Sequence, residues 1–391
     1  MKTIAVFFGG RSTEHDVSII TALTSVIKPL ELTGKYNVVP VYITKDGRWY
    51  ADEKLKDIHF YQNKDFASLL AKMKPVSLTL GDTLTLSVPT RLGRSDVAVD
   101  IAFPAMHGTY GEDGALMGLL DMANVPYVGC GLAAAAVAMD KVLAKNVAAE
   151  NGIAVTKYVS FRREQIAENV SGVAEDVEQK LTYPLFVKPA HLGSSIGISR
   201  ARDRRELENA LEVAAHYDTL IIVEEAVRNL VEVTLPIFGS TANPTPALLE
   251  QPLTHSEDFF DFDTKYMHGG KKGKGGAKSG QSSASAQGYS QIPADLSPQL
   301  YEQAESLGLA VYRALGCDGI ARVDMLIDSK SQQVYFNEIN PLPGSLYAHN
   351  WAKAGVSKVE LVEKLIGYAL KRHTTRQQLA TSFDTNFLQQ F

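Results

Sequence analysis

The residues with the clearest chemical potential lie toward the carboxyl-terminal end of the chain. Arg322 to Asp324 and Glu338 to Asn340 are fourteen residues apart, each in a run typical of a β-strand. Alternate residues of a strand share a face, so pairing of the two strands can place Asp324 beside Glu338 and Asn340. Three oxygen ligands on one face suit Mg²⁺ carried with a nucleotide phosphate. The alternative is a solvated strand edge, but apolar residues on the opposite face imply a core behind it and favour the metal site.

A second candidate site is a lysine followed by a loop of small residues. Lys188 ends the apolar run 185–188, and Pro-Ala-His-Leu-Gly-Ser-Ser-Ile-Gly follows at 189–197. Such a loop exposes backbone N–H groups and hydroxyls to a phosphate, and the lysine adds a point charge. It is not a Walker loop, because Gly-x₄-Gly-Lys-Ser/Thr occurs nowhere in the chain. A tight hairpin loop without a ligand is the alternative.

Each of three further patterns has two interpretations. Residues 129–134 (Gly-Cys-Gly-Leu-Ala-Ala) match the relaxed dinucleotide-binding pattern, but no acidic residue closes a following strand, so a tight turn is favoured over a nicotinamide oxidoreductase. The loop 107–114 follows a strand and is either a ligand loop or a helix-entry turn. The Gly- and Lys-rich segment 268–288 is either a lid over phosphates or a solvated linker.

Composition narrows the class of protein. A length of 391 residues suggests two or three domains at roughly 100–200 residues each. The net charge of −5 argues against a nucleic-acid partner, and no apolar run of about 18 residues indicates a membrane span. The amino terminus predicts a first strand rather than a signal peptide. The chain has two cysteines, which favours a reducing cytoplasm and is too few for a zinc site of cysteines alone. The nine histidines are scattered, which argues against a zinc enzyme.

The first third of the chain alternates strands and helices, which predicts an α/β unit with a parallel sheet. The strands expected there are 3–8, 37–44, 97–104 and 124–128, with a hairpin at 77–88 and helices at 17–30 and 114–123. One long Ala-rich helix is expected at 132–150, and a return strand at 196–198. The predicted domains are 1–140, a small α+β unit at 141–231, and 232–391 with a lid at 267–288.

Taken together, the motifs resemble the ATP-grasp superfamily and, within it, the D-alanine:D-alanine ligase family, over about residues 3–372. The resemblance is carried by Phe-Gly-Gly-Arg-Ser-x-Glu-His-Asp-Val-Ser at 8–18, His-Gly-x-x-Gly-Glu-Asp-Gly at 107–114, Met-Asp-Lys at 139–141, Val-Lys-Pro at 187–189 with Gly-Ser-Ser-x-Gly at 193–197, Phe-Asp-Thr-Lys-Tyr at 262–266, Arg-Val-Asp at 322–324 and Glu-Ile-Asn-x-x-Pro-Gly at 338–344.

The resemblance implies a three-domain ATP-grasp fold with an amino-terminal preATP-grasp domain and ATP between the central and carboxyl-terminal domains. It also implies that ATP phosphorylates the carboxylate of one D-alanine. The amine of a second D-alanine then attacks the acyl phosphate, for peptidoglycan synthesis. A cytoplasmic homodimer is the implied state.

The resemblance assigns roles by matching position. For the first substrate these are Glu14, Ser194 and Tyr266 as a hydrogen-bonded set, with His107. For ATP they are Lys141, Lys188, Ser195, Glu224 at the adenine, Glu232 at the ribose, Lys265 at the transferred phosphoryl group, and Leu326. Two Mg²⁺ or Mn²⁺ ions would be held by Asp324, Glu338 and Asn340. The oxyanion would be stabilised by Arg322 and the Gly344 N–H, and the second substrate held by Ser345 and Leu346.

Departures from the family pattern concern the second substrate above all. Ser345 and Leu346 follow Gly344 at once, where the family usually has a few more residues, so D-lactate, D-serine or another small amino acid is an alternative acceptor. Tyr266 favours an amine acceptor, although His268 lies nearby in the lid. Asn337 stands beside the implied adenine site, where the family usually has an apolar residue. The spacing between Glu224 and Glu232 is one residue longer than in the common family pattern. An inactive ATP-binding regulator is the alternative of another class.

Overall fold

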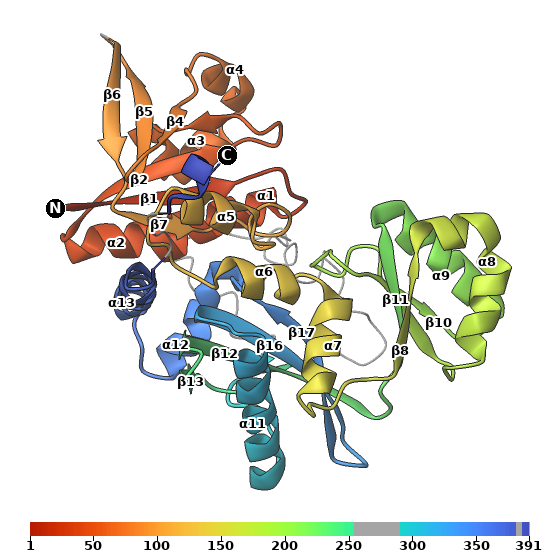
Figure 1. Ribbon diagram of the computed structural model, residues 1–391. Helices are drawn as coiled ribbons and strands as arrows, with labels where there is room; N and C mark the ends of the chain where they lie inside the picture. Colours follow the sequence, from red (N-terminus) through yellow and green to blue (C-terminus); the bar gives the residue numbers. More distant parts are fainter. Residues whose placement is uncertain (92, 254–289, 381–384, 391) are drawn as a thin grey trace, which may run out of the picture.

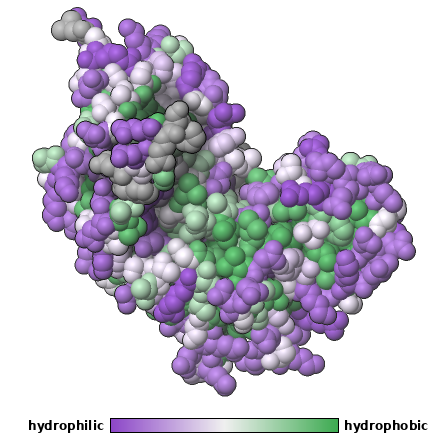
Figure 2. All heavy atoms as spheres, in the orientation of Figure 1, coloured by the Kyte–Doolittle hydropathy of each residue, from purple (hydrophilic) through white to green (hydrophobic). Residues whose placement is uncertain are grey.

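The computed structural model describes residues 1–91, 93–253, 290–380 and 385–390 (Figure 1). The lid expected at 267–288 lies outside these residues. Within the described residues, five sheets and their helices form three groups in Figure 1: an amino-terminal group, a group around the strands of residues 158–225, and a group around the strands of residues 230–340. Figure 2 shows the molecule hollowed between the first two groups, with apolar residues gathered around the hollow.

The amino-terminal group is built on a mostly parallel sheet of order β3-β2-β1-β7. The central strand β1 (Lys2–Gly9) pairs parallel with β2 (Tyr36–Ile43) and β7 (Ile101–Pro104), while β3 (Trp49–Tyr50) pairs antiparallel at the edge. The last six residues of β1 are buried, as expected of a strand covered on both faces. The parallel sheet expected from the sequence is confirmed.

The remaining elements of this group lie around that sheet. The helical elements are α1 (His15–Thr21), the π-helical η1 (Ala22–Ile27), α2 (Lys28–Thr33), η2 (Glu53–Lys56), α3 (Ile58–Gln62), α4 (Phe66–Ala71) and α5 (Ala115–Met122). A second sheet contains β4 (Ser77–Leu80), β5 (Leu84–Thr90) and β6 (Gly93–Ala98). The hairpin expected at 77–88 is therefore present as β4 and β5.

Two expected strands are wrong. The run 97–104 is divided between β6 and β7, in different sheets, because Asp100 turns the chain: its N–H donates to the Thr3 carbonyl at 3.0 Å and its carboxylate accepts from the Thr3 N–H at 2.7 Å. The run 124–128 makes one isolated bridge, between Ala102 and Tyr127, and starts from Asn124 in a left-handed conformation.

Two expected helices are also interrupted. The run 17–30 passes through the π-helical η1. The run 132–150 is two helices, α6 (Leu132–Ala138) and α7 (Lys141–Glu150), because Asp140 is extended and accepts from the N–H groups of Val142 and Leu143 at 2.9 and 3.0 Å. An aspartate in this position caps a new helix rather than continuing an old one.

The second group is an antiparallel sheet of order β10-β9-β11-β8 covered by two helices. Its elements are β8 (Tyr158–Arg162), α8 (Arg163–Glu178), β9 (Leu185–Pro189), β10 (Ser199–Ala201), α9 (Arg204–Tyr217) and β11 (Leu220–Glu225). The return strand expected at 196–198 is wrong, because these residues belong to the preceding loop, in which Gly197 has φ 72°. Pairing with β9 begins only at Ser199.

The third group is an antiparallel sheet of order β13-β12-β16-β17. Its elements are β12 (Leu230–Ser240), β13 (Asn243–Pro246), β16 (Gly319–Asp328), β17 (Gln333–Asn340) and α11 (Pro298–Ala314), with a short pair of β14 (Gln251–Pro252) and β15 (Ser290–Gln291). The buried residues of β16 and β17 share one core with α11, and with alanines of α6 and α7. The opposite face of β16 and β17 carries the chemical residues.

The end of the chain returns to the amino-terminal group. After η3 (Gly344–Tyr347) and α12 (Ala348–Lys353), α13 (Lys358–Gln377) packs beside α2, and η4 (Phe387–Gln390) follows. Leu361, Leu365 and Trp351 are buried in the same core as residues of β1. No helix within the described ranges is long and apolar enough to cross a membrane.

The start of α13 is held by a capping box. The Ser357 hydroxyl accepts from the Glu360 N–H at 3.2 Å, and the Glu360 carboxylate accepts from the Ser357 N–H at 2.9 Å. We expect Ser357→Ala to lower the free energy of unfolding by about 1 kcal/mol, measured in urea. Ser357→Asp, which keeps an acceptor, should retain most of the stability. Equal losses in both variants would contradict the capping role.

Candidate functional site

A polar cavity of about 40 Å³ lies where the three groups meet. Its lining comes from loops of the amino-terminal group, from the loop after β9, and from β16, β17 and η3: Glu14, His107, Glu112, Ser194, Arg322, Glu338, Asn340, Leu342 and Gly344. Seven of the residues assigned from the sequence are therefore brought to one place.

The pair of β16 and β17 presents the acidic residues. Asp324 is directly opposite Glu338, and Arg322 is opposite Asn340. The register then shifts, because Met325 pairs with Phe336 and leaves Asn337 as an extra residue in β17. Such a bulge redirects side chains. Here it lets Asn337 reach Lys188, at 3.3 Å, while Glu338 and Asn340 line the cavity.

Asp324 is held by three neighbours. Its Oδ1 accepts from Arg322 Nε at 3.0 Å and from Thr234 Oγ1 at 2.7 Å. Its Oδ2 accepts from Arg322 Nη2 at 2.6 Å and from Asn340 Nδ2 at 3.4 Å. The arginine also lies over the Tyr347 ring, with Cζ 5.4 Å from the centroid. Arg322 is thus fixed by a bidentate contact and an aromatic face, with its side chain at the cavity wall.

The donor set of this strand pair fits a divalent cation. Asp324, Glu338 and Asn340 offer carboxylate and amide oxygens, the ligands that Mg²⁺ and Mn²⁺ prefer. Glu338 and Asn340 line the cavity, and Asp324 adjoins both. Within the described part of the chain no group of three His, Cys, Asp or Glu residues could hold a metal, so the fit depends on Asn340 as the third ligand.

Glu14 lines the same cavity. It is buried, it accepts a hydrogen bond from Ser194 Oγ, and the loop residue Gly108 approaches it closely: a Cβ at Gly108 would lie 2.9 Å from Glu14 Oε2. Burial, together with the charge of Glu112, raises the pKa of Glu14. A cation placed here would relieve both effects, so the corner is suited to an ammonium group.

His107 connects this corner with the loop after Pro343. Its Nε2 lies 2.8 Å from Thr21 Oγ1, which also accepts from the Ser345 N–H at 2.9 Å. Burial disfavours the charged imidazolium, but Glu112 and Glu14 outweigh it, so the pKa of His107 is raised. Thr21 had not been singled out from the sequence, because only the fold brings α1 against η3.

Ser345, Leu346 and Tyr347 all adopt left-handed backbone conformations, with φ of 51–53°. Three such non-glycine residues in succession are strained, and strain of this kind clusters at functional sites. The Leu346 side chain is fully buried in the amino-terminal core, away from the cavity, whereas Ser345 is partly exposed. The two residues assigned to the second substrate are therefore placed differently.

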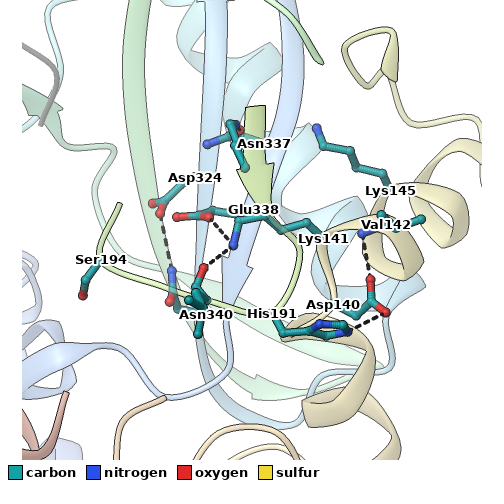
Figure 3. A network of polar contacts seen from close by, with 12 residues as sticks. Asp140, Lys141, Val142, Lys145, His191, Ser194, Asp324, Asn337, Glu338 and Asn340 are labelled. Carbon is teal, nitrogen blue, oxygen red and sulfur yellow. Dashed lines mark hydrogen bonds and ion pairs between the residues drawn. The ribbon is translucent and has the colours of Figure 1, made fainter. Parts of the chain in front are cut away.

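Lys141 and Glu338 link α7 to β17. Lys141 Nζ lies 3.3 Å from Glu338 Oε2 and donates to the Leu192 carbonyl at 2.7 Å (Figure 3). The lysine is buried at the first residue of α7, directly after the capping Asp140. It thus lies between the loop after β9 and the acidic strand pair.

A buried charge cluster lies beside it. Glu224 of β11 is 2% exposed, and its two carboxylate oxygens contact Lys145 Nζ at 2.8 Å and Lys188 Nζ at 2.5 Å. Burial alone would raise the pKa of Glu224, but the two ammonium groups lower it to about 2. Glu224, assigned to the adenine, therefore has both oxygens engaged by lysines.

Lys145 was missed by the sequence analysis, although its spacing of four from Lys141 places both on one face of α7. It is 1% exposed and also contacts Thr156 Oγ1 and the Phe336 carbonyl, each at 3.3 Å. Burial lowers the pKa of Lys145 despite Glu224, whereas the pKa of Lys188 is raised because its carboxylate neighbours outweigh burial.

The structure says less about the remaining residues to which the family resemblance assigns roles. Glu232 is exposed on β12 and opposite Leu326 of β16, so the two are neighbours. Ser195 follows Ser194 in the loop after β9, and both have left-handed backbone conformations. Lys265 and Tyr266 lie outside the described residues.

The buried cluster gives a stability prediction. We expect Lys145→Met to lower the free energy of unfolding by about 3–5 kcal/mol, because it leaves Glu224 buried with half its compensation. Because the pKa of Glu224 is lowered, the loss should be full above about pH 5 and shrink as acid protonates the carboxylate. Urea unfolding at several pH values measures it. Lys157→Met, at an exposed lysine, is the control; equal effects would contradict the cluster's role.

Comparison with known proteins agrees with this geometry. Residues 3–130 match the family described as the D-ala D-ala ligase N-terminus, and residues 147–367 match the D-ala D-ala ligase C-terminus. D-alanine–D-alanine ligases of Chloroherpeton thalassium and Chlorobium phaeovibrioides are 36% and 38% identical over 384 and 375 residues. These alignments cover 96% and 94% of this chain and 98% and 97% of those proteins.

Solved structures give the same result. The D-alanine–D-alanine ligase from Coxiella burnetii superposes with a TM-score of 0.77 at 27% identity, covering 96% of each chain. The VanG D-Ala:D-Ser ligase from Enterococcus faecalis superposes with a TM-score of 0.74 at 30% identity, covering 94% of this chain and 99% of that one. The fold is the α/β ATP-grasp fold of these neighbours. With both family matches spanning most of its length, the chain belongs to the D-alanine–D-alanine ligase family.

Proposed function

We propose that this protein joins two D-alanine molecules to D-alanyl-D-alanine for peptidoglycan synthesis, with conversion of ATP to ADP and phosphate through an acyl phosphate. The observation that carries the proposal is the cavity itself. A carboxylate corner at Glu14 faces Arg322 and the Gly344 backbone across a space bordered by Glu338 and Asn340. This arrangement offers an ammonium site, an oxyanion site and a set of oxygen ligands to one amino acid and one nucleotide.

The first D-alanine would be held at the Glu14 corner. Its ammonium group would supply a positive charge beside Glu14, whose pKa is raised by burial and by Glu112. Ser194 orients the carboxylate, and His107 completes the wall. Tyr266 would belong to the same hydrogen-bonded set by its motif. The substrate carboxylate would then face the acidic strand pair and its cations.

The nucleotide would lie between β9 and β17. Lys141 of α7 is paired with Glu338, and Lys188 of β9 is paired with Glu224. Lys265 would reach the transferred phosphoryl group. Ser195, Glu232 and Leu326 would contact the nucleotide. Phosphoryl transfer depends on positioning and charge neutralisation more than on covalent help, which these residues supply.

Asp324, Glu338 and Asn340 would hold two Mg²⁺ or Mn²⁺ ions. When bound, such ions neutralise phosphate charge and orient the oxygens of the transferred group. The chain's own contribution is the register that places the three oxygen ligands on one face and the pairing of Arg322 with Asp324.

Arg322 and the Gly344 N–H would stabilise the oxyanion that forms when the second amine attacks the acyl phosphate. A planar guanidinium beside a backbone donor is suited to that charge, and its rigid setting avoids reorganisation during the reaction. Exclusion of water also matters, because water would hydrolyse the acyl phosphate.

A second candidate function is ligation of D-alanine to another acceptor, such as D-serine, D-lactate or another small amino acid. The observation in its favour is the short strained loop 345–347, whose Ser345 N–H is tied to Thr21. The similar VanG structure is that of a D-Ala:D-Ser ligase. The remaining alternative is an inactive ATP-binding regulator.

We further propose that the protein is a cytoplasmic homodimer with the divisions 1–140, 141–231 and 232–391. Both cysteines are free and buried, which supports a reducing compartment. Separate cores beneath the second and third sheets support the divisions, although α7 shares its alanines with the third core.

The proposal predicts the outcome of a direct assay. Purified protein with ATP and Mg²⁺ should release phosphate with D-alanine alone and form a product with the mass of D-alanyl-D-alanine. Parallel reactions contain D-alanine with D-serine, D-lactate or L-alanine. A mixed product formed in preference to the D-alanine dimer would favour the second candidate. Nucleotide binding without phosphate release in any reaction would favour the regulator.

The oxyanion assignment predicts the effect of one substitution. Arg322→Ala should lower kcat by about 100-fold or more, as the loss of an oxyanion donor does, while circular dichroism shows a folded protein. Arg163→Ala, at an exposed arginine of α8, is the matched control and should keep normal turnover. Near-normal turnover in Arg322→Ala would refute the assignment.

A further inference from the structure

His191 in the loop after β9 contacts two carboxylates at once. Its Nδ1 lies 2.9 Å from Asp218 Oδ1, and its Nε2 lies 3.3 Å from Asp140 Oδ2 (Figure 3 shows the Asp140 contact). The His191 backbone N–H also donates to Asp218 Oδ2 at 2.7 Å. Asp140 and Asp218 are largely buried, whereas the His191 ring is 43% exposed and in contact with solvent.

This geometry requires a charged ring. A neutral imidazole has one nitrogen without a proton, and that nitrogen would face a carboxylate oxygen with no hydrogen between them. Only the imidazolium donates to both partners. In agreement, hydrogen bonds to Asp140 and Asp218 raise the pKa of His191 to about 9, against the opposing effect of burial. Lys141, the nearby cation on α7, directs its ammonium to Leu192 and Glu338 instead.

Each partner of His191 anchors a different element. Asp140 caps α7, the helix that carries Lys141 and Lys145. Asp218 also accepts from the N–H groups of Thr219 and Leu220 and so fixes the start of β11, the strand of Glu224. His191 therefore joins the start of loop 190–197 to α7 and β11, the helix and the strand that carry Lys145 and Glu224 of the buried charge cluster.

The conformation of the rest of loop 190–197 depends on this fixed start. The Leu192 carbonyl accepts from Lys141, and Ser194 donates to Glu14 across the cavity. Ser194, Ser195 and Gly197 have left-handed conformations with φ of 54°, 60° and 72°. Glycine adopts this conformation without strain, but the two serines do not, so the loop keeps one shape only when other contacts offset their strain.

We propose that His191 is a positioning residue for nucleotide binding: its imidazolium ties loop 190–197 to Asp140 and Asp218, and so holds Ser195 and the backbone of the loop in the conformation that receives the nucleotide. The inference rests on the proposed function, since it takes the loop to be the phosphate-binding loop. Loss of the His191 charge, by substitution or by deprotonation, would release the start of loop 190–197 from Asp140 and Asp218. Binding of ATP would weaken more than the chemical step.

The test combines an NMR titration with kinetics. In full-length protein labelled at histidine ¹³Cε1, the resonance that disappears in His191→Asn should titrate near pH 9. At pH 7.5 we expect His191→Asn to raise the KM for ATP about tenfold, as loss of hydrogen bonds to charged groups does, with kcat within about threefold. Wild-type KM for ATP should rise as the pH passes about 9, and the variant should lack this rise.

The matched control is His216→Asn, at an exposed histidine of α9, which should behave as wild type. Asp218→Asn should move the pKa of His191 and the rise in KM to lower pH together. A His191 pKa near 6.5, an unchanged KM in His191→Asn, or a rise in KM that does not follow the pKa in Asp218→Asn would overturn the inference. Calorimetric titration with Mg·ADP reports the same affinity changes without turnover, so absence of D-alanine ligation would refute the proposed function separately.

Discussion

The buried carboxylate of Glu224 is the constraint on which the arrangement of the site depends. A charge this deeply buried is tolerated only when paired with good geometry, and its partners come from two other elements: Lys188 of β9 and Lys145 of α7. Lys145 extends the connection to the Phe336 carbonyl of β17. The second and third sheets are therefore joined at one charge cluster, which Lys188 extends to Asn337 of β17.

The same pairing of opposite charges recurs around the cavity. Lys141 is paired with Glu338 and Lys188 with Glu224, so the lysines suited to phosphate already have carboxylate partners, as Arg322 has in Asp324. Under the proposed function, a triphosphate that reached these cations would compete with the carboxylates, and a divalent ion that reached the carboxylates would compete with the cations. Binding of nucleotide and metal together would remove both competitions, because each would take the place of the other's partner.

Local patterns predicted much of the fold, and tertiary contacts explain the rest. The two-residue period of a strand predicts that Glu338 and Asn340 share a face, beside Asp324 of the paired strand, and the register agrees. The break at Asp140 was missed because an Ala-rich run on either side outweighs one capping residue in a propensity argument. Lys145 gave no signal beyond its spacing, because burial of a lysine is decided by Glu224, 79 positions away in the chain. The bulge at Asn337 likewise exists only in the pairing of two strands.

The packing of α13 on the amino-terminal sheet has a consequence for synthesis of the protein. Trp351, Leu361 and Leu365 belong to the core of β1, so one side of that core stays open until these residues have left the ribosome. The sheet of β1 is therefore completed by a helix that lies about 350 residues later in the chain. During that interval its apolar face is exposed to chaperones and to other nascent chains. Emergence of α13, rather than of the strands themselves, is the event that closes this part of the molecule.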